Sequence, residues 1–186
     1  MGEKIITPIA TLSYPYLFSP VKNEQGDEYY SCALVFDESA DIQPLMAAAI
    51  EAGAGKFGPK FTEGVKAGKF SMPFRTDVEE KGYPAGSTFI NVRSKYKPGV
   101  VDRFAGPDGK PMKIDGDEAA KVYAGALVRA SLRAFAYDKA GKRGVSFGLL
   151  NIQKLGEGPR LDGRMAASEE FEATEKMEAV PFENQF

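Results

Sequence analysis

The feature that most limits how this chain can fold is a pair of strand-like segments, residues 123–137 and 145–155, joined by a turn-forming stretch. Every second residue from Val122 to Ala136 is apolar, which is the two-residue period of a strand with one buried face. The stretch 138–143 between the segments is typical of a hairpin turn. The sequence therefore predicts a long antiparallel hairpin with one face in a hydrophobic core.

Shorter segments with strand signals precede this hairpin. We expect a first strand at the start of residues 4–18, followed by an aromatic loop, and further strands over residues 28–36 and 89–94. Residues 105–117 are rich in turn-forming residues. Because strands and helices do not alternate, these segments predict an antiparallel barrel or sandwich rather than a parallel sheet.

One helix is expected between the second and third strands. Asp41 can cap a helix over residues 41–52, Pro44 suits its first turn, and Gly53 would end it. Residues 53–88 are rich in glycine, proline and lysine, and we interpret them as long ordered loops.

The opposite face of the 123–137 strand carries basic and aromatic side chains. Arg129, Arg133, Phe135 and Tyr137 share this face, because side chains alternate across a strand. Guanidinium groups pair with phosphates, and bases stack on aromatic rings whatever their sequence. This face is a candidate surface for single-stranded nucleic acid, although a solvated sheet face with Phe135 covered by a loop fits the pattern equally well.

Other segments also interleave basic and aromatic residues. Each of them alone is as well explained by buried rings and solvated charges, but together they favour a groove that follows a flexible polyanion. The further candidate binding residues are Tyr14, Tyr16, Phe18, Arg75, Tyr83, Arg93, Lys95, Tyr96, Lys97, Arg103, Lys139, Lys142 and Arg143.

Charge is distributed unevenly along the chain. The whole chain has a net charge of −2, but residues 169–186 contain six glutamates and one lysine. Their net charge of −5 leaves +3 for the rest of the chain. A basic body suits a polyanion such as DNA, whereas the acidic segment suits a different partner.

The acidic segment ends in an aromatic residue. We expect residues 1–165 to form one domain and residues 166–186 an acidic, disordered tail. Phe182, Glu183 and the terminal Phe186 form a handle that can bind an apolar, basic-rimmed pocket on a partner protein. The tail can also compete with DNA for the basic body; the alternative is that it only keeps the protein soluble.

The residue types present limit the chemistry. The chain has no histidine, which excludes imidazole as a base, acid or metal ligand. Its single cysteine, Cys32, excludes an intrachain disulfide and a thiolate zinc site, and we expect it to be a packed thiol. We expect no cofactor, no metal and no catalytic residue. A competing hypothesis is a Mg²⁺-dependent nuclease, whose candidate carboxylates are Asp77, Glu79, Glu80, Asp115, Asp117 and Glu118.

Seven segments spread over about residues 5–165 form a pattern of their own. They are Leu12–Pro20, Tyr30–Phe36, Lys56–Gly58, Pro73–Asp77, Asn91–Asp102, Tyr123–Leu132 and Gly144–Gln153. In this order and spacing they resemble a family of bacteriophage single-stranded DNA-binding proteins that was first catalogued as a domain of unknown function.

The resemblance implies an all-β OB-fold, a five-stranded Greek-key barrel with one or two short helices, long loops and a flexible C-terminal tail. It also implies sequence-independent binding of single-stranded DNA in phage DNA replication, recombination or repair, without enzymatic activity. The tail would recruit replication or recombination proteins. A phage structural or assembly protein remains the alternative.

The sequence gives no sign of a membrane protein. No stretch approaches the ~20 apolar residues that span a bilayer, and the N-terminus lacks the apolar segment of a signal peptide. We therefore expect a cytoplasmic location, in the host cell if the chain is phage-encoded. Self-association of the chain is compatible with the same sequence.

Overall fold

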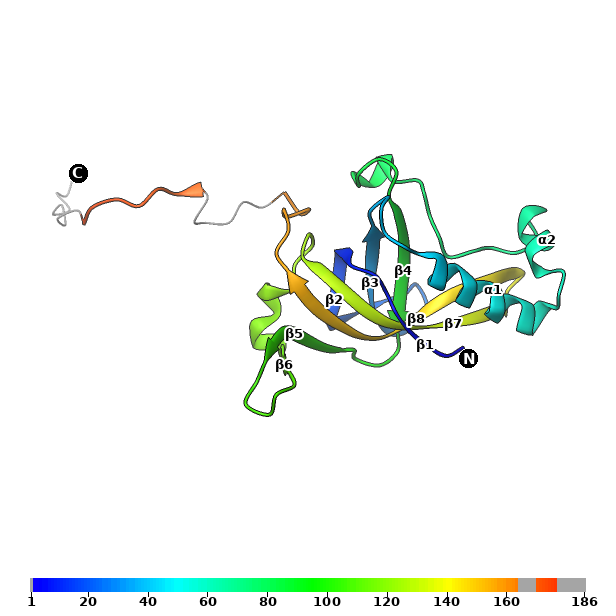
Figure 1. Ribbon diagram of the computed structural model, residues 1–186, viewed down its shortest axis with the longest axis horizontal. Coiled ribbons are helices and arrows are strands. Elements are labelled where there is room, and N and C mark those ends of the chain that lie inside the picture. The colour runs from blue at the N-terminus through cyan, green and yellow to red at the C-terminus, as the bar shows by residue number, and fades with distance from the viewer. Residues whose placement is uncertain (1, 164–169, 177–186) are drawn as a thin grey trace, which may run out of the picture.

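The computed structural model describes residues 2–163 and 170–176 of the chain. Within them, eight strands, two α-helices and two 3-10 helices follow one another (Figure 1). The elements are β1 (Lys4–Ile6), β2 (Ala10–Lys22), β3 (Glu28–Phe36), α1 (Gln43–Phe57), α2 (Phe61–Lys66), η1 (Glu79–Lys81), β4 (Thr88–Ser94), β5 (Gly99–Ala105), β6 (Pro111–Lys113), η2 (Gly116–Lys121), β7 (Leu127–Lys139) and β8 (Lys142–Gly156).

Five of the strands close into a barrel. Their order is β7-β2-β3-β4-β8, and the pairing of β8 with β7 closes the ring. These pairs are antiparallel except for β4 and β8, which run parallel where Val92 and Arg93 meet Phe147 and Gly148. Three short strands extend the sheet: β1 pairs with β7, β5 pairs with β8, and β6 pairs with β5.

The hairpin of β7 and β8 forms as the sequence predicts. The two strands stay paired from Leu127 with Gly156 to Lys139 with Lys142, and Ala140 and Gly141 turn the chain with positive φ values of 53° and 77°. The alternating apolar residues of β7 are buried, as expected for the core face: Val128, Ala130, Leu132 and Ala134. The strand begins at residue 127 rather than 123, because residues 123–126 form a turn.

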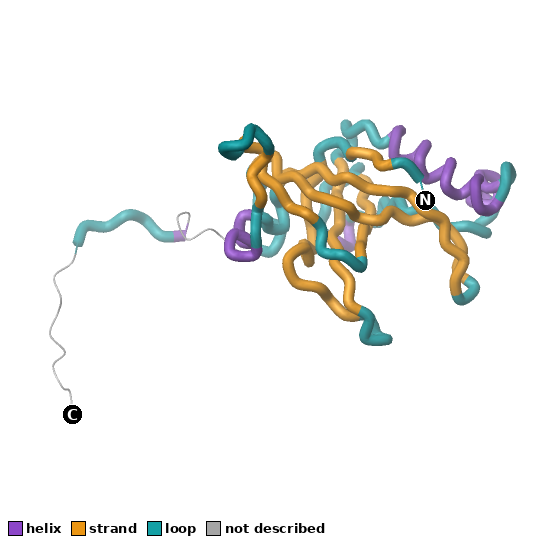
Figure 2. Tube along the Cα trace, turned by 90° about the horizontal axis from the view of Figure 1, so that it is seen from below, coloured by secondary structure: helices purple, strands orange, loops and turns teal. Residues whose placement is uncertain are grey.

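The hydrophobic core fills the barrel and continues under the helices. Leu12, Leu34, Ile90 and Phe147 are fully or almost fully buried inside the barrel. Helix α1 lies against β7 and β8 and adds Leu45 to the same core. Figure 2 shows α1 and α2 at one end of the strands and the 3-10 helix η2 near the other end. No helix in the described part of the chain is long and apolar enough to cross a membrane.

The predicted helix is longer than expected. Asp41 accepts a hydrogen bond from the Gln43 N–H at 3.1 Å, but α1 then runs past Gly53 to Phe57. A β-carbon on Gly53 would lie 2.2 Å from Phe61 of α2, so this glycine allows close helix packing instead of ending the helix. The prediction that residues 53–88 are only loops is wrong, because they contain the end of α1, α2 and η1.

Two other predicted loops also contain strands. The aromatic loop expected after the first strand belongs to β2, whose pairing with β3 shifts register between Ser13 and Tyr16 and again before Val21. The turn-rich residues 105–117 contain β6, which pairs with β5 in an exposed hairpin. Irregular pairing explains why a simple alternation of side chains does not reveal these strands.

Candidate nucleic-acid interface

The barrel carries an open groove of about 910 Å³ on one face. Residues of β2, β3, β4, β7 and β8 line it, together with the turn between β2 and β3 and the turn between β7 and β8. Six predicted binding residues lie in this groove: Tyr14, Arg93, Phe135, Tyr137, Lys139 and Lys142. The structure thus gathers residues that are far apart in the sequence on one concave surface.

Aromatic rings lie at several points along the groove. Phe135 and Tyr137 of β7 and Tyr29 of β3 all line it. The Phe135 ring lies close to Gly148, where an added β-carbon would be 3.9 Å from the ring. Tyr14 is 53% exposed and has a φ of 45°, which is a strained value for a bulky residue. Partly exposed rings of this kind can stack on bases.

A row of basic residues crosses the same face of the barrel. Arg93 of β4 lies opposite Gly148 of β8, and Gly148 lies opposite Arg133 of β7. Arg133 in turn lies opposite Lys4 of β1. Paired residues share a face of the sheet, so the three cations lie on one side of it. Gly148 has no side chain that would separate Arg93 from Arg133.

The cations of this row have no acidic partner among the described residues. No hydrogen bond or ion pair joins the side chain of Lys4, Arg93 or Arg133 to another described residue, although the Arg93 guanidinium lies 5.9 Å from the ring centre of Tyr29. The Arg133 Nε is buried without a hydrogen-bond partner among the described residues. A buried unpaired donor is costly, and an anion beside the guanidinium would lower this cost.

Three predicted binding residues interact mainly within the protein. Tyr83 is only 8% exposed and donates a hydrogen bond to Ser13 Oγ at 2.9 Å, and burial raises its pKa. Phe18 packs partly buried against the core. Arg75 binds Asp77 through two hydrogen bonds of 3.0 and 2.7 Å, which lower the pKa of that carboxyl group. We therefore place these residues outside the groove.

Three further predicted residues, Arg129, Arg143 and Tyr16, do not line the groove. Arg129 extends the same face of β7 and donates a hydrogen bond to Gln153 at 2.8 Å. Arg143 lies over the ring of Phe70 at 5.3 Å. Tyr16 is 46% exposed and lies in a neighbouring cavity that also contains Tyr14 and Tyr83.

A second exposed basic and aromatic surface follows β4. Lys95, Tyr96 and Lys97 form the connection to β5, and Tyr96 is 83% exposed. Arg103 of β5 lies 4.6 Å from the ring centre of the exposed Phe104. These residues do not line the groove. The predicted partner-binding residues Phe182, Glu183 and Phe186 lie outside the described residues.

Two residues of this interface were not predicted from the sequence. Tyr29 lines the groove, and its alternation with Ser31 and Ala33 along β3 is a signal that could have identified it. Lys4 lies in the basic row because β1 pairs with β7, and the sequence around Lys4 does not predict that pairing.

Several carboxylates of the nuclease hypothesis form ion pairs. Asp77 binds Arg75, Asp115 lies 3.4 Å from Lys113, and Glu118 binds Lys121. Across residues 2–163 and 170–176, no three acidic or cysteine side chains gather as metal ligands do. The buried Cys32 matches the expected packed thiol, and burial raises its pKa to about 12.

Comparisons with known proteins agree on one kind of relative. Residues 3–180 match the family described as Enterobacter phage Enc34, ssDNA-binding protein. The structure of the bacteriophage Enc34 single-stranded DNA-binding protein in complex with ssDNA is similar, with a TM-score of 0.65 and 19% identity over 84% of this chain and 88% of that one. Gp2.5, a single-stranded DNA-binding protein encoded by bacteriophage T7, aligns with a TM-score of 0.61 and 13% identity over 96% of this chain and all of that one. No curated protein sequence matches the chain.

The structural likenesses confirm the expected fold, a mostly β OB-like barrel with a few short helices. The family match covers nearly the whole chain and agrees with the resemblance carried by the seven segments. The protein belongs to the family of the single-stranded DNA-binding protein of Enterobacter phage Enc34.

Proposed function

We propose that this protein binds single-stranded DNA, irrespective of sequence, in the groove between β2, β3, β4, β7 and β8. The observation that carries the proposal is that partly exposed rings and basic side chains without carboxylate partners among the described residues occur together on this concave face. Bases would stack on Tyr14, Tyr29, Phe135 and Tyr137.

Phosphates would bind the cations of the same face. Arg93, Arg133 and Lys4 offer charge across the barrel, and Lys139 and Lys142 offer it at the hairpin turn. Neither set of contacts reads base edges, which is why no sequence preference is expected. The family membership of the chain supports the same ligand.

The experiment that tests this function is a fluorescence titration with oligo-dT over a salt series. Phosphate neutralisation releases counterions, so affinity should fall steeply as salt rises. Mixed-sequence oligonucleotides should bind with similar affinity. Lack of binding at ~50 mM salt, where such contacts are strong, would refute the proposal.

The biological role follows from this ligand. The protein would act without catalysis in the replication, recombination or repair of phage DNA, in the cytoplasm of the host cell. Phe182, Glu183 and Phe186 would recruit replication or recombination proteins. Recovery of such proteins from phage-infected cells by the full chain but not by Phe182→Ala/Phe186→Ala tests this part; equal recovery by both chains would contradict it.

A further inference from the structure

A second cavity of about 740 Å³ lies next to the groove. Four segments form its walls: Ser13–Tyr16 of β2, Lys81–Tyr83 at the end of η1, Ala120 of η2 with Val122–Ala124 before β7, and Arg160–Asp162 after β8. Tyr14 lines both the groove and this cavity. The two hollows therefore meet at one tyrosine ring.

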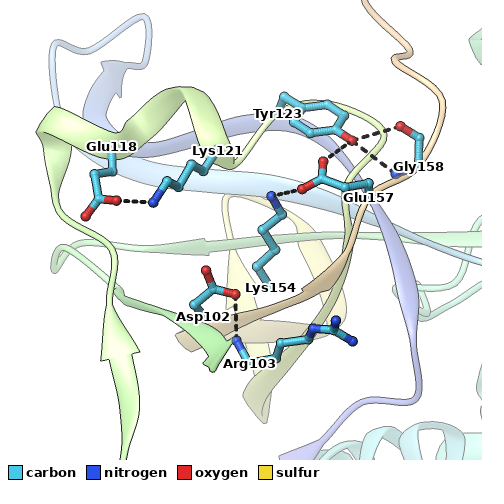
Figure 3. A network of polar contacts seen from close by, with 8 residues as sticks. All are labelled: Asp102, Arg103, Glu118, Lys121, Tyr123, Lys154, Glu157 and Gly158. Atoms are coloured by element: carbon cyan, nitrogen blue, oxygen red, sulfur yellow. Dashed lines mark hydrogen bonds and ion pairs between the residues drawn. The ribbon is translucent and has the colours of Figure 1, made fainter. Parts of the chain in front are cut away.

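The far wall of the cavity holds a fixed aromatic ring. The hydroxyl of Tyr123 lies 2.6 Å from Glu157 Oε2 and accepts a hydrogen bond from the Gly158 N–H at 3.1 Å (Figure 3). Glu157 also accepts a hydrogen bond from the buried Lys154 at 2.5 Å. These contacts hold the ring in place before any ligand arrives.

Cations lie over two of the tyrosine rings that line the cavity, those of Tyr14 and Tyr123. The Arg160 guanidinium is 4.7 Å from the ring centre of Tyr123, and Lys81 Nζ is 5.9 Å from the ring centre of Tyr14. Arg160 also forms a 3.0 Å ion pair with Asp162. Lys81 forms no ion pair with any residue in the described ranges, so it is available to a phosphate.

Tyr14 separates the two hollows in a strained conformation. Its φ of 45° is unfavourable for a non-glycine residue, and such strain concentrates at ligand-binding sites. Tyr14 lies within a register shift of β2 against β3, between Ser13 and Tyr16, and is 53% exposed. A ring held in this way can stack with a base from either hollow.

We propose that the cavity is a second nucleotide-binding subsite, so that a DNA strand leaving the groove passes over Tyr14 and places a further base between Tyr14 and Tyr123. This inference rests on the proposed function, because the groove must bind the first segment of the same strand. The exposed ring of Tyr14 and the partly exposed ring of Tyr123 offer stacking surfaces, and Lys81 offers a phosphate contact, as single-strand binding requires. Arg160 is held by Asp162, so it supports the Tyr123 ring rather than a phosphate.

The proposal predicts that the cavity contributes only to the binding of longer strands. The test compares oligo-dT from about 4 to about 16 nucleotides, the range of OB-fold site sizes, on the full chain and on Lys81→Gln/Arg160→Gln. The variant should bind the longest oligonucleotide about five- to ten-fold more weakly and the shortest within about two-fold of the unmodified chain. Lys60→Gln/Lys66→Gln, which removes two exposed lysines at α2, is the matched control and should not change either affinity.

The outcomes separate this inference from the function on which it rests. If the unmodified chain binds no oligonucleotide, the proposed function fails and the subsite fails with it. If the chain binds but the cavity variant loses nothing at any length, or loses the same factor at every length, only the subsite is overturned. Photocrosslinking of 5-iodouracil oligonucleotides gives a second readout: Tyr123 should be labelled by long strands alone, and its absence from the labelled peptides would overturn the subsite.

Discussion

At the scale of single residues, the cations without an ion pair among the described residues should dominate DNA binding. Arg93 and Arg133 form no ion pair with the described residues, whereas Arg75 is held by Asp77. We expect Arg93→Gln and Arg133→Gln each to weaken oligo-dT binding and to reduce the salt slope by about 0.7, the value for one single-strand phosphate contact. Fluorescence titration over a salt series measures both quantities.

Arg75→Gln is the control for this prediction, because it removes the same charge from a residue outside the groove. It should leave the slope unchanged. Equal slopes for Arg75→Gln and Arg133→Gln would contradict the placement of the interface.

The ion pair of Lys154 and Glu157 should make stability depend on pH. Hydrogen bonds from Lys154 and then from Tyr123 lower the pKa of Glu157. A carboxyl group whose pKa is lowered by folding adds stability above its unfolded pKa, and this stability is lost as the pH falls through the lower folded pKa. The Glu157 side chain is 71% exposed, so solvent screens the pair. Glu157→Gln should therefore destabilise the protein by up to about 1 kcal/mol at neutral pH, because it removes the counter-charge of the buried Lys154 ammonium.

The measurement is urea unfolding of Glu157→Gln and of the unmodified chain at neutral pH and at about pH 3, below the usual glutamate pKa. The difference between the two proteins should shrink at the acidic pH, because protonation of Glu157 in the unfolded chain then offsets the stability that the lowered folded pKa provides. A difference that is independent of pH would show that the ion pair is not its cause.

At the scale of elements, the packing of α1 against α2 depends on one glycine. A β-carbon on Gly53 would lie 2.2 Å from the Phe61 ring, whereas nothing lies within 4 Å of a β-carbon on Gly55. Gly53→Ala should destabilise the protein by about 1–3 kcal/mol through overpacking. Gly55→Ala in the same helix should stabilise it by up to about 1 kcal/mol. Thermal unfolding of both variants measures these two stability changes. Equal changes would contradict the specific role of Gly53 in helix packing.

The same glycine shows what the sequence could predict about the elements. The apolar alternation in β7 is a local pattern, and it predicted both the strand and its buried face. The end of α1 was misplaced because Gly53 serves a contact with Phe61, which no local pattern reveals. The strand character of residues 14–20 was missed because register shifts disturb the period of two in β2.

The sequence predicts that basic and aromatic residues form the candidate interface, but it does not predict which of these residues lie in it. Arg133 and Phe135 share a face through simple alternation, so the sequence identified them. Tyr83 also lies near a basic residue in the sequence, Lys81, but its ring packs against Phe89 in a small buried cluster. Only the closure of the barrel determines which rings and cations meet, since β4 pairs with β8, and β1 with β7, from distant parts of the chain.

At the scale of the whole molecule, opposite charges divide the chain into two parts. Residues 169–186 carry −5 and the remainder carries +3. An acidic segment tethered to a basic groove competes with DNA at a high effective concentration. We therefore expect deletion of residues 169–186 to strengthen oligo-dT binding at low salt, by about three-fold or more.

The salt dependence of this gain identifies its cause. Attraction between exposed charges is screened over about 10 Å at 0.1 M salt and over about 3 Å at 1 M, so the gain should vanish as salt rises. A chain in which the six tail glutamates are replaced by glutamine keeps the length of the tail and removes its charge. If the tail competes through charge, this chain should bind DNA as tightly as the deletion does. If the glutamine-substituted chain binds like the unmodified chain while the deletion chain binds more tightly, the tail acts by obstruction. If neither variant changes the affinity across the salt series, the two parts of the molecule do not compete.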